Sequence, residues 1–260
     1  MTAILRNESR KLLRGSGLLT GLIVVLSFFF LAVFPGIKEE AEAIRDLYPE
    51  YIVAILGFEE LHTFEGFAAG YVYPLVMVVL AGIYVAYVAA GMINADIRDR
   101  KMDLTLSNPV SRESVVLQKV GALWVPLLVL NVGLFVVLVV GALLLGEPID
   151  PLSFVMVHLF SVPYLLVCGG IGIVLSVVLD REGSAQAAAL GLVFVLWLVD
   201  GIAEMSPDFE LLGRVTPSRY YDPVAILVHE EYALLDAGVL LVAFLVLLGV
   251  AVVVFVRRDI

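Results

Sequence analysis

Six long stretches of the chain contain no Asp, Glu, Lys or Arg, and this pattern constrains the fold more strongly than any other feature. A helix needs about 20 apolar residues, within a range of about 17–25, to cross the hydrocarbon core of a bilayer. The shortest of the six stretches has 17 residues, so each is long enough to span. The stretches are Gly15–Ile37, Gly66–Ala95, Val120–Gly146, Pro151–Leu179, Gly183–Val199 and Ala237–Val256.

These spans are expected to be helices. Hydrocarbon offers no partner for free backbone groups, so only helices and closed barrels cross it. A barrel strand alternates apolar and polar residues, whereas a run such as Leu134–Val140 is apolar throughout. The sequence therefore predicts an all-α polytopic protein of the cell membrane, with six transmembrane helices that form one membrane domain over residues 1–260.

The composition agrees with this class and excludes others. Hydrophobic residues make up 61% of the chain, and its mean hydropathy is +1.02, far above that of a soluble domain or a disordered chain. The single cysteine, Cys168, cannot build a disulfide scaffold. A net charge of −10 argues against a nucleic-acid partner.

Basic residues are distributed unevenly over the loops, and this sets the expected orientation. The loops on one side hold 12 of the 16 Lys and Arg residues but only 8 of the 26 Asp and Glu residues. These loops are 1–14, 96–119, 180–182 and 257–260. Because cytoplasmic loops carry the excess of Lys and Arg, we expect both termini to be cytoplasmic, with the inverted topology as the alternative. The loops expected outside are 38–65, 147–150 and 200–236.

Several loops are expected to contain short helices. Residues 1–14 mix four basic residues with apolar ones, which fits either an interfacial helix on the inner leaflet or an ordinary basic flank. In the 96–119 loop, Asn108–Pro109 should separate two short helices, because proline disfavours helical geometry in the residue before it. Ser111 is then the expected N-cap of the second helix. The two longer outer loops each have room for an interfacial helix.

Catalytic and cofactor motifs are absent from the sequence. It contains no G-x-x-x-x-G-K-[ST], no H-E-x-x-H and no G-x-S-x-G, so the chain itself is not expected to be an enzyme or to hold a cofactor. Met156, His158 and Cys168 do not fall on one helix face, so no metal site is expected. The absence of a carboxylate from the middle of any span disfavours a proton-coupled carrier and favours a permease driven by a partner.

One cytoplasmic loop carries a family resemblance. Residues 103–112 read Asp-Leu-Thr-Leu-Ser-Asn-Pro-Val-Ser-Arg and are followed by an aliphatic stretch that ends at Lys119. This segment resembles the loop between the second and third spans of type-2 ABC transporter permeases. The outer segment Arg219–Pro223 and the C-terminal Phe255–Ile260 are similar to that family at the same places. Members commonly have a Gly-Thr pair before the acidic residue, where this chain has Arg100-Lys101, which points to a contact built by charges.

The resemblance implies a permease subunit that moves a solute across the membrane with energy from ATP hydrolysed by a separate subunit. The implied partners are two copies of an ABC ATP-binding subunit, which bind the ATP and Mg²⁺, and a second permease copy, giving a homodimer. The 96–119 loop would contact the ATPase and carry its movement to the spans. The residues implied in this coupling are Asp96, Asp99, Arg100, Asp103, Ser107 and Arg112.

Four polar residues within the spans are candidates for a translocation path, because polar groups are costly in hydrocarbon and are therefore often functional. They are Asn131, His158, Ser161 and Tyr164. The simpler interpretation of His158 is hydrogen bonding between helices.

Other functions stay open. The same ATPase-driven movement could act on an extracellular protein docked on the acidic outer face, with no solute crossing. The chain could instead be a structural membrane protein or an intramembrane enzyme, and the 96–119 loop could be solvated without a partner. Lys is also scarce, with 4 residues against 12 Arg, and the outer loops are acidic. A surface of that kind stays hydrated in strong salt, which predicts a halophilic prokaryote, an archaeon above all.

Overall fold

All regular elements in residues 3–47, 60–107, 109–205 and 207–258, the parts that the computed structural model describes, are helices. Six helical segments are long and apolar enough to cross a membrane, which confirms the prediction of an all-α polytopic protein. In chain order they are Ala3–Asp46, Phe64–Arg98, Arg112–Leu145, Pro151–Val178, Glu182–Glu204 and Leu234–Arg257.

Four of the spans are single α-helices and two are composite. The single ones are α1 (Ala3–Asp46), α8 (Pro151–Val178), α9 (Glu182–Glu204) and α12 (Leu234–Arg257). The second span joins α3 (Phe64–Phe67), the π-helices η2 (Ala68–Val72) and η3 (Pro74–Ala81), and α4 (Gly82–Arg98). The third span joins α6 (Arg112–Ala122) to α7 (Trp124–Leu145).

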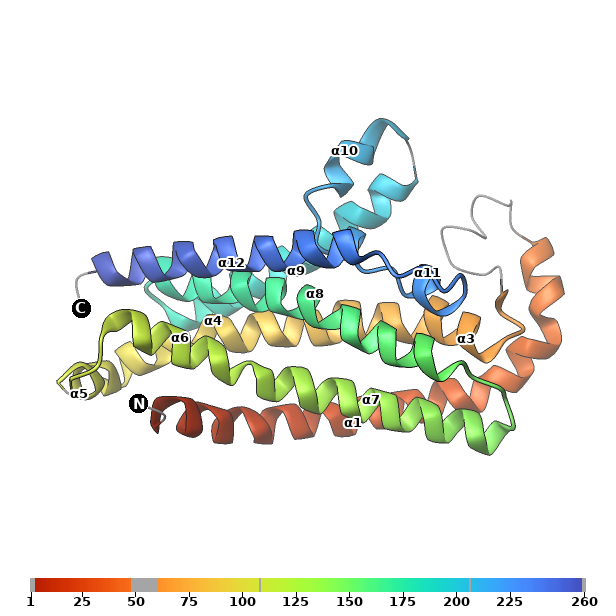
Figure 1. Ribbon diagram of the computed structural model, residues 1–260, viewed down its shortest axis with the longest axis horizontal. Coiled ribbons are helices and arrows are strands. Elements are labelled where there is room, and N and C mark those ends of the chain that lie inside the picture. Colours follow the sequence, from red (N-terminus) through yellow and green to blue (C-terminus); the bar gives the residue numbers. More distant parts are fainter. Residues whose placement is uncertain (1–2, 48–59, 108, 206, 259–260) are drawn as a thin grey trace.

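The spans run side by side along the long axis of the molecule (Figure 1). Both ends of the chain and α5 (Lys101–Leu106) lie at one end, which we call the cytoplasmic end after the orientation that the basic residues predict. The opposite end, called the outer end, carries α11 (Pro223–Leu227). There η4 (Pro207–Phe209) and α10 (Glu210–Gly213) stand out from the side of the bundle, and η5 (Ser218–Tyr220) leads back to it.

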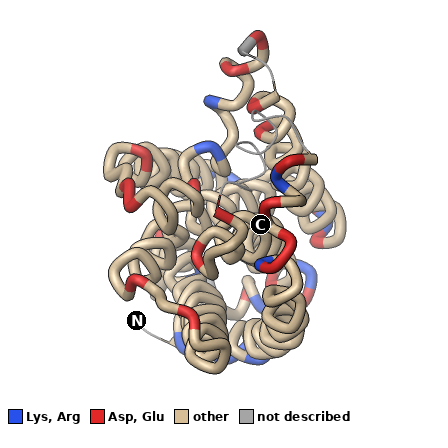
Figure 2. The backbone as a smooth tube through the Cα atoms, turned by 90° about the vertical axis from the view of Figure 1, so that its right-hand side faces the viewer, with Lys and Arg blue, Asp and Glu red and all other residues tan. Residues whose placement is uncertain are grey.

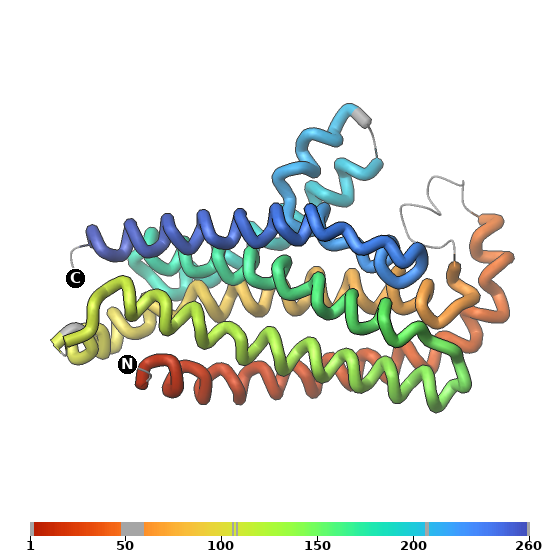
Figure 3. Tube along the Cα trace, viewed as in Figure 1, coloured from red at the N-terminus to blue at the C-terminus, as the bar shows by residue number. Residues whose placement is uncertain are grey.

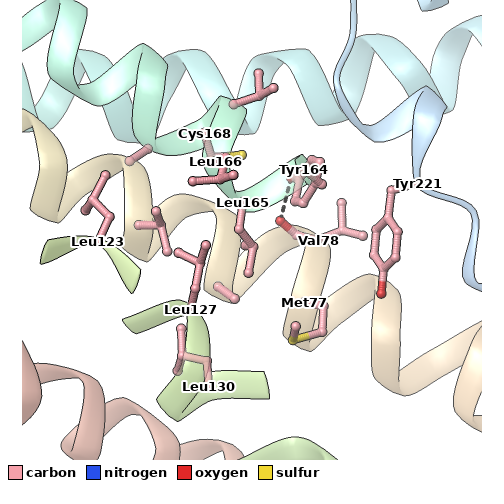
Figure 4. Close-up of a cluster of buried hydrophobic side chains, with 14 of the residues drawn as sticks. Met77, Val78, Leu123, Leu127, Leu130, Tyr164, Leu165, Leu166, Cys168 and Tyr221 are labelled. Atoms are coloured by element: carbon pink, nitrogen blue, oxygen red, sulfur yellow. Dashed lines mark hydrogen bonds between the residues drawn. The ribbon is translucent and has the colours of Figure 1, made fainter. Parts of the chain in front are cut away.

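The core lies around α8, which is the most buried span. Helices α4 and α12 pack along it, and a Cβ at Gly172 would overlap the backbone carbonyl of Ala86 on α4. Only glycine therefore allows α4 and α8 to approach this closely. Figure 4 shows the apolar centre, where side chains such as Met77, Leu127 and Leu165 meet from three spans.

Helix α1 is longer than the apolar stretch that predicted it. The sequence left open whether residues 1–14 form a separate interfacial helix, and their described part continues into the span without interruption. At the other end the helix passes Pro35 and continues through a run of Glu and Ala, which favour helix, to Asp46. The next residues of this outer loop, 48–59, lie outside the described parts of the chain.

The second span departs from α-helical geometry over most of residues 68–81. Pro74 lies at the first position of η3 and has no N–H to donate, so the regular hydrogen-bond ladder cannot pass through it. A π-helix accommodates this by widening the turn, and such segments often mark functional sites. Tyr73, at the junction of η2 and η3, is fully buried.

Candidate functional site

The loop between the second and third spans is built as two stems and a short crossing helix. It leaves the bundle along α4, turns into α5 at the tip and returns along α6 (Figure 3, yellow to yellow-green). As predicted, α6 begins after a break and is capped by Ser111, whose side chain accepts the Ser114 N–H. Asn108, on which the predicted break was placed, lies outside the described residues, although Pro109 falls between the two helices.

Arg100 makes the turn at the tip. Its φ of 54° is left-handed, a conformation that glycine adopts without strain and other residues adopt rarely. The resembling family commonly has glycine at this place. The turn geometry is therefore present here, although the glycine that would adopt it without strain is not.

Charged side chains surround this turn. Asp99 accepts hydrogen bonds from Lys101 Nζ at 2.7 Å and from Arg98 Nε at 3.0 Å. These bonds, the one from Lys101 first, lower the pKa of Asp99 to about 2, so its carboxylate stays charged at any cellular pH. Arg98 also binds Glu182, which begins α9, and this contact ties α4 to the fifth span.

Asp103 and Ser107 lie on or next to α5 and are exposed. The Ser107 hydroxyl donates to the Leu104 carbonyl at 2.9 Å and so satisfies a backbone group at the end of the helix. Together with Asp99 and Arg100, these residues form an exposed polar tip at the cytoplasmic end.

The remaining two predicted coupling residues lie in the stems and contact the bundle. Asp96, on α4, binds Lys119 Nζ at 2.6 Å, and Lys119 also donates to the Met92 carbonyl at 2.8 Å. Arg112, the first residue of α6, donates to the carbonyls of Val256 and Arg258 and so caps the end of α12.

Arg258 extends this chain of contacts to the centre of the fold. Its guanidinium donates to the Val177 carbonyl at 3.1 Å, at the end of α8, and to Asp180 Oδ1 at 2.8 Å. The loop is therefore connected to α12 through Arg112, and α12 to α8 through Arg258. Sequence reasoning did not name Arg258 or Lys119 as site residues, whereas it did expect the short loop from Asp180 to Gly183 to be a second, smaller contact. The one signal was a lysine at the edge of an apolar stretch.

Three of the four predicted path residues form one buried cluster with a fourth residue that the sequence did not indicate. His158 Nδ1 lies 2.9 Å from Asn131 Oδ1, and the Ser161 hydroxyl lies 2.8 Å from the same oxygen. On the other side of the ring, His158 Nε2 lies 3.0 Å from the Tyr73 hydroxyl. Tyr164 is not part of the cluster, because its hydroxyl donates to the Val78 carbonyl at 2.8 Å (Figure 4).

The hydrogen bonds of the cluster fix its chemistry. Asn131 Nδ2 donates to the Leu127 carbonyl at 2.9 Å, so its Oδ1 must be the acceptor facing His158. His158 Nδ1 therefore donates to Asn131 Oδ1, while Nε2 is hydrogen-bonded to the Tyr73 hydroxyl. Edge contacts from Tyr73 and Phe135, each with its ring centre 5.5 Å from the imidazole, complete the surroundings.

The outer end holds a further contact between distant segments. Lys38 of α1 binds Glu147, in the loop before α8, at 2.6 Å. Across the described ranges, no group of three or more His, Cys, Asp or Glu side chains is arranged to hold a metal ion.

The chain matches one protein family over nearly its whole length. The family model, described as ABC-2 family transporter protein, matches residues 2–260. No curated protein matches the chain.

Proposed function

Since the chain belongs to the ABC-2 family of transporter proteins, we propose that it moves a solute across the cell membrane using ATP hydrolysed by a separate nucleotide-binding subunit. Membership makes it a membrane subunit of an ABC transporter that associates with an ATP-binding subunit and is not itself catalytic. The proposal includes the movement of a solute and two copies of the ATPase, which bind ATP and Mg²⁺. It also includes pairing with a second permease copy as a homodimer.

The observation that carries the proposal is the construction of the α4–α5–α6 loop. Its tip presents Asp99, Arg100, Asp103 and Ser107 at the end of the molecule, where a partner can reach them. Its stems continue directly into the second and third spans, and Arg112 connects it to α12. A rigid-body displacement of the tip would therefore reach several spans at once.

The buried cluster of Tyr73, Asn131, His158 and Ser161 supports a path between the second, third and fourth spans. Each of these polar side chains is bound to another in the state described, so a solute would have to replace these hydrogen bonds as the spans separate. A buried polar group left without a partner is costly, and a solute with polar groups would offset that loss.

The experiment is ATP turnover by the purified complex with the candidate ATP-binding subunit. The permease is expected to change the ATPase rate, and the double variant Asp103→Ala, Arg112→Ala is expected to abolish that change. The matched control is Glu210→Ala, Arg214→Ala, which removes an exposed acid–arginine pair at the outer end and should behave as the wild type. An ATPase rate indifferent to the permease and to the loop variant would refute the proposal.

A second candidate function is transmission of the ATPase movement to an extracellular protein, with no solute crossing. The observation that favours it is the charge of the outer end, which Figure 2 views directly and where Asp and Glu (red) outnumber Lys and Arg (blue). A basic protein would be attracted to this surface. Two results together would favour this function over transport. A basic protein would be captured from the outer side, and the solute content of vesicles would stay unchanged during ATP hydrolysis.

A further inference from the structure

Four charged side chains form a closed ring at the cytoplasmic end, where α1, α4 and α6 meet. Lys119 Nζ lies 2.6 Å from Asp96 and 3.5 Å from Glu8, and Lys11 Nζ lies 2.7 Å from Glu8 and 4.0 Å from Asp96. Acid and base alternate around the ring, so its formal charge is zero. We call Glu8, Lys11, Asp96 and Lys119 the charge ring.

The ring is largely shielded from solvent. Lys119 is 1% exposed, and Glu8 is also buried, while Lys11 reaches the surface. Ionised groups are tolerated in such a place only when they are paired and hydrogen-bonded, and Lys119 meets this condition with two carboxylates and the Met92 carbonyl. Removal of one member would leave the ring with a net charge in a poorly hydrated place.

The charge ring connects segments that lie on both sides of the α5 tip. Asp96 lies near the end of α4, the stem that leads to α5, and Lys119 lies on α6, the stem that returns from it. Their contact therefore closes the base of the loop. Glu8 and Lys11 lie on α1, so their ion pairs with Lys119 and Asp96 attach this helix to the base of the loop, in addition to its packing against α6.

We propose that the charge ring joins the two stems of the loop to each other and to α1, so that a displacement of α5 moves α1 together with the second and third spans. Glu8, Lys11 and Lys119 are then positioning residues for coupling, which act through Asp96 and the stems and not by contact with the ATPase. The role in coupling rests on the proposed function, but the attachment of α1 to the loop can be measured in the permease alone.

The experiment measures the distance between α1 and α5 in the full-length chain, reconstituted in lipid nanodiscs without ATPase. Spin labels at Leu13→Cys and Leu104→Cys suit double electron–electron resonance, because these side chains are 54% and 70% exposed, while the native Cys168 is buried. With the ring intact, the distance distribution should be single and narrow.

The informative variant is Asp96→Asn combined with Lys119→Met, since it removes one acid and one base together. It leaves Glu8 paired with Lys11 and the site neutral, so the protein should fold where the single variant Lys119→Met does not. The width of the distance distribution is expected to at least double, because the ion pairs between α1 and the loop are lost and only the packing of α1 against α6 and α7 remains.

The matched control is Lys38→Met with Glu147→Gln, which removes the ion pair that holds the other end of α1. It should leave the α1–α5 distribution unchanged. A double ring variant with the wild-type distribution would overturn the proposal, as would a control that broadens it equally.

ATP turnover separates this inference from the proposed function. If the ring variant broadens the distance distribution and also weakens the effect of the permease on the ATPase at least tenfold, both the charge-ring proposal and the proposed function are supported. If the distribution broadens while the wild-type permease has no effect on any ATPase, the attachment of α1 to the loop stands and the proposed function fails.

Discussion

Arg100 is a residue whose backbone, more than its side chain, sets the shape of the loop. Its left-handed φ of 54° costs a residue with a Cβ about 1–2 kcal/mol. Arg100→Gly should therefore raise the free energy of unfolding by up to about 1 kcal/mol, and Arg100→Val should lower it, because a β-branched side chain fits this conformation worst. Thermal unfolding in detergent, followed by circular dichroism, checks the order Gly, Arg, Val. A glycine variant as unstable as the valine variant would contradict the reasoning.

Asn131 is the residue on which the buried polar cluster depends. Asn131→Ala removes the acceptor shared by His158 and Ser161. The Ser161 hydroxyl can still donate to the His158 carbonyl, but the buried His158 ring loses its partner at Nδ1, which should lower the free energy of unfolding by about 1–3 kcal/mol. Asn94→Ala is the matched control, because Asn94 is equally buried and its side-chain nitrogen and oxygen have no hydrogen-bond partner among the described residues. Its loss should be clearly smaller, and equal losses at the two sites would show that the hydrogen bonds contribute little.

At the level of elements, the contact between α4 and α8 depends on the absence of one side chain. Gly172→Ala would place a Cβ against the Ala86 carbonyl, and the helices would have to separate, at a cost of about 1–3 kcal/mol typical of overpacking. Gly201→Ala, in α9, adds the same atom where it meets nothing within 4 Å, so it should be neutral or stabilising. Unfolding temperatures of the two variants in the same detergent check the contrast.

The elements themselves could be predicted from the sequence far better than their contacts. Bilayer thickness dictates the length of an apolar stretch, so six spans follow from counting, and proline and serine mark the break before α6. The pairing of Tyr73 with His158 joins residues 85 positions apart, and Arg112 binds a carbonyl 146 positions away. No local pattern encodes such contacts. The π-helices of the second span were also not predicted. Whether the chain around Pro74 becomes a kink or a π-helix depends on how the neighbouring helices pack against it.

Across the whole molecule, charge is separated between the two ends. The outer loops hold 18 of the 26 acidic residues and only 4 of the 16 basic ones. Repulsion among these carboxylates should be relieved by salt, because the screening length falls to about 3 Å at 1 M. We expect the unfolding temperature of the purified protein to rise between 0.1 M and 3 M KCl. An unchanged temperature would count against adaptation to a halophilic, archaeal environment.

The buried polar cluster also has a consequence for how the chain enters the membrane during synthesis. Chains are made from the N-terminus, and their early segments begin to fold first. Tyr73 and Asn131 belong to the second and third spans. Both hydrogen-bonding partners of the His158 ring are therefore made before the fourth span. The polar groups of that span are thus satisfied at once, without waiting for the fifth and sixth. We therefore expect the first four spans to form a nascent unit that hides the polar atoms of this cluster from lipid while translation continues.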